Sequence, residues 1–193
     1  MVARSEDSRQ AILQATLELL GVKGAQEPGT TVQRLTIEAI AKRAGVSKTT
    51  IYRWWDSKAA VVIDAFVVEY LPRTVVRTDL PFREALVDHL SSVVRQYAGM
   101  DGAVIAQLIA ESQYSAETLE ELHRRFWDDR RDAAIALVQR GMDEGAIDPT
   151  ADPNLVASLV YAPVYQRLLF KDGPLDDSFA QSIVSMALRG VAS

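Results

Sequence analysis

The segment from Thr36 to Lys58 constrains the fold most, because its residues, TIEAIAKRAGVSKTTIYRWWDSK, predict two short helices joined by a tight turn. In its first half, apolar residues recur at the three-and-four spacing of one helical face: Ile37, Ile40, Ala41 and Ala44. We therefore expect a first helix whose apolar stripe packs inward.

Capping residues stand at the ends of both expected helices. Thr36 can accept a hydrogen bond from a free amide of the first turn, and Ser47 can do the same for the second helix. Gly45 between them can adopt the left-handed conformation that closes a helix C-terminus. The resulting turn is about three residues long, which suits a helix-turn-helix and is too short for a relaxed antiparallel hairpin.

The second helix is expected to present a polar outer face. If Ile51 and Trp55 point into the core, the 100° step per residue turns other side chains outward, namely Thr49, Tyr52 and Arg53. Hydroxyls, a phenol and a guanidinium suit phosphate and base edges in a major groove, and Arg53 is the best candidate for a bidentate guanine contact. A solvated polar face on an ordinary hairpin is the alternative.

The flanks of this helix extend the candidate DNA-binding surface. Thr50, Tyr52 and Lys58 are expected to contact phosphate, since they carry donors without a two-pronged pattern. The complete predicted set is Thr36, Arg43, Ser47, Lys48, Thr49, Thr50, Tyr52, Arg53, Trp54 and Lys58.

The stretch AIAKRAGVSKTTIYRWWDSKAAVV resembles the DNA-binding module of the TetR family of bacterial transcriptional regulators. A preceding helix over Ile12 to Gly24 and the turn Asp56-Ser57-Lys58 complete the resemblance. It implies an all-α fold of about nine helices. In this fold, a three-helix DNA-binding domain (1–58) joins a larger helical domain for effector binding and dimerisation (59–193).

Two features depart from the family pattern. The connection 25–35 is about seven residues longer than usual, so phosphate contacts carried over to it are in doubt. Trp54 stands where many members carry His or another aromatic residue.

The charge distribution fits a DNA-binding N-terminal domain. The net charge of −5 divides into nine basic against six acidic residues over 1–58, and twelve against twenty over 59–193. Positive charge is therefore concentrated in the part expected to face phosphate. The sequence has no cysteine, no apolar run near 18 residues and no signal-peptide pattern, so we expect a cytoplasmic protein without a membrane partner.

Residues 59–193 are expected to form helices with punctuated connections. Helices are predicted over 59–71, 82–97, 104–112, about 116–142, 154–170 and 175–189. The long helix over 116–142 should face inward with Leu119, Leu122, Phe126, Ala133 and Leu137.

The last two predicted helices are apolar over broad faces. In the family, the corresponding pair forms a four-helix interface, so the resemblance implies a homodimer, which would suit a palindromic site. The candidate interface residues are Val156, Leu159, Val160, Val164, Leu168, Phe179, Ile183 and Met186. Burial against the same chain is the alternative.

A bend at Pro163 could open a cavity for a small-molecule effector. Residues that combine apolar bodies with hydrogen-bonding tips could line it: Gln107, Tyr114, His123, Phe126, Trp127, Tyr161 and Tyr165. Core packing is the alternative for each aromatic residue.

Catalysis finds little support in the sequence. The step from Glu120 to His123 is of the kind used in di-iron helical bundles, but the other histidine, His89, lacks a matching glutamate. No phosphate loop or nucleophile elbow is present, and we expect no catalytic residue, metal site or cofactor.

The leading hypothesis is a repressor that binds a palindromic double-stranded operator as a homodimer and is released by a small molecule. The alternative is an effector-independent or architectural DNA-binding factor controlled by a protein partner. The operator, the effector, the regulated genes and the structure of segment 25–35 stay open.

Overall fold

A computed structural model describes residues 2–22 and 29–190, and these residues contain helices and no strand. The all-α prediction is confirmed. The helices are α1 (Val2–Leu19), α2 (Ile37–Ala44), α3 (Lys48–Tyr52), α4 (Lys58–Tyr70), α5 (Phe82–Tyr97), α6 (Met100–Ser112), α7 (Ala116–Leu122), α8 (Asp128–Asp143), α9 (Pro153–Phe170) and α10 (Asp177–Gly190), with a 3-10 turn η1 (Leu71–Arg73) and a π-helical turn η2 (His123–Trp127). Across this described part of the chain, no helix is both long and apolar enough to span a membrane.

The chain divides into two compact units. Unit 1 comprises residues 1–70 and 103–127, and unit 2 comprises residues 71–102 and 128–193. The predicted boundary after residue 58 lies inside unit 1, because α4 packs against α1. The division into DNA-binding and effector-binding domains therefore stays a functional prediction that these compact units do not reproduce.

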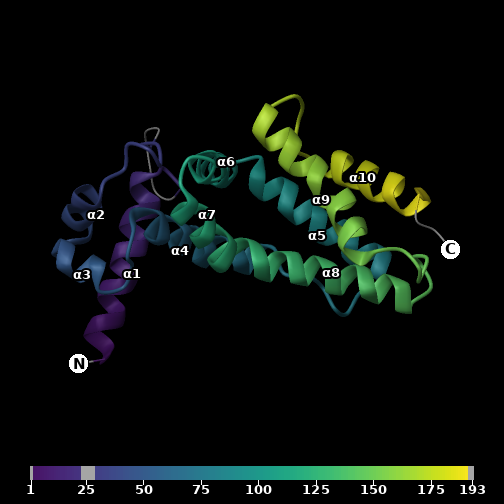
Figure 1. The fold of residues 1–193 in the computed structure, drawn as a ribbon, viewed down its shortest axis with the longest axis horizontal. Coiled ribbons are helices and arrows are strands. Elements are labelled where there is room, and N and C mark those ends of the chain that lie inside the picture. Colours follow the sequence, from purple (N-terminus) through teal and green to yellow (C-terminus); the bar gives the residue numbers. More distant parts are fainter. Residues whose placement is uncertain (1, 23–28, 191–193) are drawn as a thin grey trace. The chain divides into compact units, whose positions relative to one another are not determined.

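In unit 1, α2 packs on α1 and on α3, and α1 also contacts α3 and α4 (Figure 1). Ile12 of α1, Ile40 of α2, Ile51 of α3 and the following Trp55 are fully or almost fully buried, as the apolar pattern predicts. Helix α1 begins at Val2, ten residues before the predicted start at Ile12. The prediction missed these first turns because they are polar and show little apolar periodicity.

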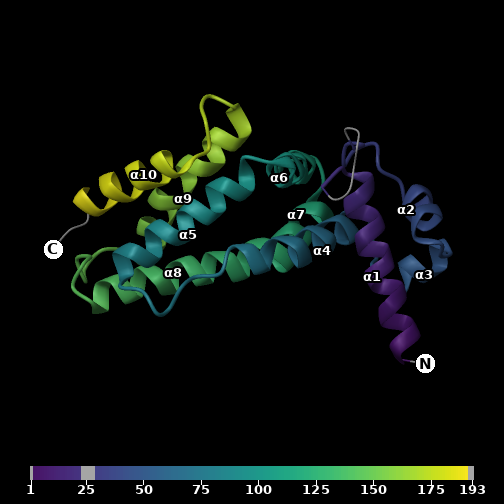
Figure 2. The same cartoon turned by 180° about the vertical axis from the view of Figure 1, so that it is seen from behind.

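In unit 2, α10 packs on α5 and α9, while α8 contacts both α5 and α9 (Figure 2). The predicted stripe of α5 is confirmed as core, since its members are at most 4% exposed: Leu86, Leu90, Val93 and Val94. These four helices form a bundle whose interior is mainly aliphatic.

The predicted helix over 116–142 contains the π-helical turn η2 between α7 and α8. A π turn inserts one residue into the helical repeat. After this turn, Ala134 is buried, whereas the predicted Ala133 is exposed. The inward prediction is also wrong for Leu119, which is 40% exposed, whereas Leu122, Phe126 and Leu137 are buried as expected.

Candidate nucleic-acid interface

The hairpin has the capping geometry that its sequence predicts. The Thr36 hydroxyl accepts a hydrogen bond from the Ala39 amide at 3.1 Å, and Ser47 accepts one from the Thr50 amide at 3.2 Å. Gly45 ends α2 in the left-handed conformation, with φ 67°. These caps satisfy orphan amides at both helix starts and fix the three-residue turn between α2 and α3.

Helix α3 is shorter than the pattern suggests, because it ends at Tyr52 and Arg53 forms its C-cap. The next two amides, of Trp54 and Trp55, still donate to the Ile51 carbonyl at 2.9 and 3.1 Å. The two tryptophans therefore lie in a turn tied to the end of α3, with Trp55 buried and Trp54 36% exposed.

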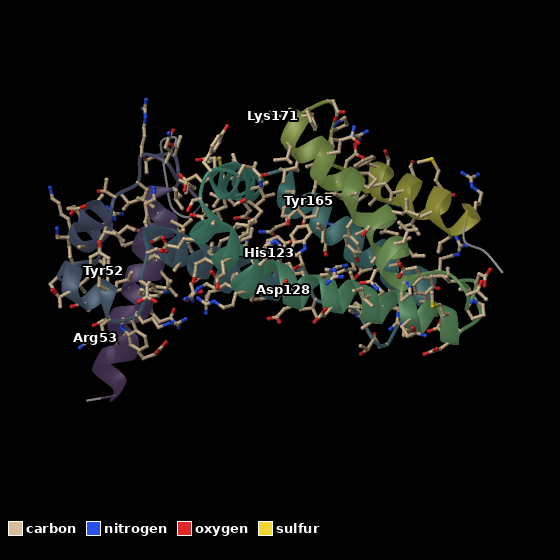
Figure 3. All side chains as sticks on the ribbon, in the orientation of Figure 1. Tyr52, Arg53, His123, Asp128, Tyr165 and Lys171 are labelled. Atoms are coloured by element: carbon tan, nitrogen blue, oxygen red, sulfur yellow. The ribbon has the colours of Figure 1, made fainter. Side chains whose placement is uncertain are left out.

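The outward set emerges from α3 as predicted. Thr49, Tyr52 and Arg53 are exposed, and Tyr52 has 52% of its surface accessible. Figure 3 marks Tyr52 and Arg53 at the end of this helix. Within the described residues, the Arg53 guanidinium makes no ion pair, so its five donors are available to an external acceptor.

Two other candidate cations are held in ion pairs. The Arg43 Nε donates to Glu18 at 2.7 Å, and the Lys48 ammonium donates to Glu38 at 2.7 Å. The hydrogen bond from Lys48 lowers the pKa of Glu38, and the same bond raises the pKa of Lys48. The sequence analysis did not predict these acidic partners, although Glu38 lies in the first turn of a predicted helix.

The phosphate contact of Lys58 stays a prediction, and the structure gives its ammonium several partners within the chain. Its ammonium donates to the carbonyls of Val32 and Gln33 at 2.7 and 3.3 Å, and it lies 3.8 Å from the Glu111 carboxylate. The side chain is 28% exposed. Lys58 therefore anchors the segment before α2.

The predicted dimer residues divide into a buried group and an exposed group. For the buried group the prediction is wrong, since side chains already inside their own chain have little area left to bury: Val156, Val160, Val164, Leu168 and Ile183. Leu159 and Met186 are 52% and 58% exposed, and Phe179 is half-buried beneath the Arg167 guanidinium.

Five predicted effector contacts lie in unit 1, and they stay predictions. Gln107 accepts a hydrogen bond from the Val32 amide at 2.7 Å and so holds a loop. Tyr114 is 94% exposed. Phe126 is core, with its ring 5.4 Å from that of Phe66. His123, which is exposed, has its ring 6.4 Å from that of Trp127.

The other two predicted effector contacts, Tyr161 and Tyr165, belong to α9 in unit 2. The Tyr161 hydroxyl shares a 2.6 Å hydrogen bond with Nδ1 of His89, and the Tyr165 hydroxyl lies 3.2 Å from that of Tyr97 (Tyr165 is marked in Figure 3). Both tyrosines therefore pair with α5.

An open polar groove in unit 2 was missing from the sequence prediction. It is lined by Arg73, Ser92, Arg95, Gln96, Gly99 and Asp101. Asp101 is buried, and burial raises its pKa, although Arg73 lies 3.4 Å away. These residues are ordinary polar positions in the sequence, and only folding brings them together.

An all-helical chain with a capped three-residue turn and exposed donors on its second hairpin helix is a helix-turn-helix DNA-binding regulator of transcription. The family described as "Bacterial regulatory proteins, tetR family" matches residues 12–65, and "Tetracyclin repressor-like, C-terminal domain" matches residues 80–187. The chain belongs to the TetR family, whose members are transcriptional regulators and not enzymes.

Individual relatives agree with this assignment. The chain is 34% identical over 188 residues to the HTH-type transcriptional regulator YdeS of Bacillus subtilis, covering 97% of this chain and 91% of YdeS. The crystal structure of the TetR family transcription regulator SCO0332 is 28% identical with a TM-score of 0.80, covering 97% and 100% of the two chains. FadR of Bacillus subtilis in complex with stearoyl-CoA has the same fold, with 16% identity, a TM-score of 0.71 and coverage of 94% and 98%.

Proposed function

We propose that this regulator is a repressor that binds a palindromic operator as a homodimer in the cytoplasm and is released by a small-molecule effector. The observation that carries the DNA-binding part is the outer face of α3, where Thr49, Tyr52 and Arg53 are exposed beside a buried Ile51. A rigid, capped hairpin holds donors for phosphate and base edges on one surface.

The ion pairs of Arg43 and Lys48 do not oppose this proposal. Both cations are more than half exposed, at 57% and 54%. An exposed ion pair contributes little to stability because solvent screens it, so a DNA phosphate can replace either carboxylate at small cost. We propose that both residues contact the DNA backbone, whereas Arg53 reads a base.

Selection of preferred sequences from a random DNA pool tests the DNA-binding proposal. We expect Arg53→Ala to weaken binding to the selected operator by about 1 to 3 kcal/mol and to relax the preference at one base pair. Arg83→Ala removes an equally exposed cation from α5 and serves as the matched control, with affinity close to that of the parent. Equal effects of the two variants would contradict base reading by Arg53.

For the homodimer, the exposed side of α9 supports an interface. Its exposed apolar residues are spaced by four, three and seven positions and so lie along one helical face, on which the polar Gln166 interrupts the apolar series: Leu155, Leu159, Ala162 and Leu169. Met186 adds an exposed apolar side chain on α10. A two-fold dimer would present two α3 helices to half-sites about 34 Å apart.

A charged residue within this stripe tests the interface. Leu159→Glu should yield monomers by light scattering and should weaken operator binding, because a buried carboxylate without a partner is costly. Ala136→Glu introduces the same charge at an exposed position of α8 and should leave the dimer intact. A dimeric Leu159→Glu protein would remove this face from the proposal.

The effector part of the proposal rests on unit 2, where Tyr161 and Tyr165 offer hydroxyls inside a largely apolar bundle. The FadR structure with stearoyl-CoA shows that this fold accommodates a small molecule. An effector acts by its differential affinity for two conformations, so a hundredfold release of DNA requires about 2.7 kcal/mol.

A screen for compounds that raise the melting temperature, followed by operator binding with each hit, tests the effector. A compound that stabilises the protein and releases the operator supports the proposal, and Tyr161→Phe or Tyr165→Phe should weaken its binding. Operator binding that responds to no compound, but is altered by a protein partner, would favour the effector-independent alternative.

A further inference from the structure

A partly buried hydrogen bond links the turn that follows α3 to α4. The indole N–H of Trp55 donates to Oδ2 of Asp64 at 2.7 Å, and the Trp55 side chain is 2% exposed. Its backbone amide donates to the Ile51 carbonyl of α3 at 3.1 Å. A displacement of Asp64 therefore acts on α3 through one rigid, buried side chain.

The second oxygen of Asp64 binds a different part of unit 1. Arg125 Nη1 donates to Oδ1 of Asp64 at 2.8 Å, and Arg125 Nε donates to Glu121. The side chains of Arg125, Asp64 and Glu121 are only 20%, 18% and 15% exposed. Such partly buried, charge-assisted hydrogen bonds are stronger and more directional than surface ion pairs.

The charges of this cluster stabilise one another. Burial alone would lower the pKa of Arg125, but hydrogen bonds to Glu121 and Asp64 raise it overall. Burial alone would likewise raise the pKa of Glu121, but hydrogen bonds from Arg125 and Arg124 lower it. The cluster is thus a connected network in which Asp64 binds Trp55 and Arg125 by hydrogen bonds and also lies 4.0 Å from the Arg9 guanidinium of α1.

The partner at the far end of the network is the π-helical turn. Arg125 lies within η2, and its neighbour Phe126 packs its ring 5.4 Å from Phe66 and 5.7 Å from Tyr70 of α4. One turn therefore holds α4 by an ionic and an aromatic contact. A π turn can revert to α-helical hydrogen bonding only by a discrete change of register, which would move Arg125 relative to Asp64.

We propose that Asp64 is a positioning residue for DNA recognition: it bridges Trp55 and Arg125, so that the state of the π-helical turn sets the position of the DNA-reading helix α3. This inference rests on the proposed function and deepens it. If Asp64 had only a structural role, an acceptor for the buried Trp55 indole would be enough. The second contact, with Arg125, is not needed for that role, and it is the contact that supports a positioning role.

Variants of the two ends separate the positioning role from stability. Asp64→Asn retains an acceptor for the Trp55 indole but removes the charge that binds Arg125, and Arg125→Met removes the same ion pair from the other side. Arg125→Lys keeps the charge and is the conservative variant for rescue. Asp79→Asn is the matched control, because it breaks an exposed ion pair with Arg77 in unit 2.

The measurements are affinity for the selected operator, affinity for unrelated DNA of equal length and the melting temperature. We expect Asp64→Asn and Arg125→Met to lower operator affinity about tenfold while changing affinity for unrelated DNA less than about twofold. The double variant should be no weaker than Asp64→Asn alone, because that substitution already removes the contact that Arg125→Met removes. Arg125→Lys should recover part of the loss, and Asp79→Asn should bind like the parent.

The outcomes distinguish this inference from the proposed function. A parent protein that selects no sequence from the pool would overturn both. The positioning role alone would be overturned if the parent selects an operator and both variants, Asp64→Asn and Arg125→Met, melt at a lower temperature but keep the parent's ratio of operator affinity to unrelated-DNA affinity.

Discussion

His89 gives unit 2 a pH-dependent stability whose size follows from its surroundings. Its ring lies on α5 and is buried, with a hydrogen bond to Tyr161 and another to the backbone of Thr74. Burial and the nearby positive charge of Arg130 lower the pKa of His89 from 6.5 to about 4, outweighing the opposite influences of the Thr74 backbone and of Asp88. The folded protein therefore holds this imidazole neutral.

The sign and magnitude of the effect follow by linkage. Because the folded-state pKa lies below the unfolded one, the unfolded chain takes up a proton first as the pH falls. Stability from the neutral ring is complete above about pH 6.5 and is lost progressively as the pH falls to about 4. A difference of about 2.5 pKa units corresponds to about 3 kcal/mol.

The variant His89→Gln isolates this contribution, since its amide can reproduce both hydrogen bonds of the neutral ring and does not titrate. Urea unfolding at a fixed protein concentration, followed from about pH 7 to about pH 4, should show the parent losing about 3 kcal/mol more than this variant. His123→Gln replaces the other histidine, which is exposed, and is the matched control. Parallel curves for the parent and His89→Gln would refute the reasoning.

Two further predictions concern packing and caps. A Cβ at Gly141 would lie 2.7 Å from the buried Phe82 ring, so Gly141→Ala should lower the free energy of unfolding by about 1 to 3 kcal/mol, measured by thermal unfolding. The control Gly190→Ala, whose Cβ would have no atom within 4 Å, should lower it much less. Equal effects of the two variants would contradict the close approach. Ser47→Ala should destabilise the hairpin by about 1 kcal/mol, measured as faster amide hydrogen exchange, and Thr49→Ala, which removes an exposed hydroxyl that is not a cap, should leave that exchange unchanged.

Local features of the DNA-binding hairpin could be predicted because each depends on few neighbouring residues. The caps at Thr36 and Ser47 and the left-handed Gly45 act within four positions of the chain, and all three are confirmed. The inward positions Ile40 and Ile51 follow from the helical repeat and are fully buried. Their DNA-binding counterparts on the outer face stay predictions.

Other interactions escaped prediction because they depend on distant partners or on a break in periodicity. Lys58 finds its acceptor at Val32, and Gln107 finds its donor at the same residue, 75 positions away. Helix α9 is apolar on both sides, so its sequence does not reveal which stripe turns inward, and the dimer prediction included core residues such as Val160. The π-helical turn interrupts the α-helical repeat, which a uniform repeat cannot anticipate, and the predicted Ala133 is exposed whereas Ala134 is buried.

Contacts of Val32 fix the position of the chain just before the DNA-binding hairpin. Both backbone groups of this residue are bound, the amide to Gln107 and the carbonyl to Lys58, and its side chain is fully buried. We therefore expect a change in chain length between residues 23 and 28 to leave α2 in place. A fluorescent tag or an epitope inserted in that connection should leave operator reading intact, which makes the unusual insertion a practical attachment point for following this regulator in cells.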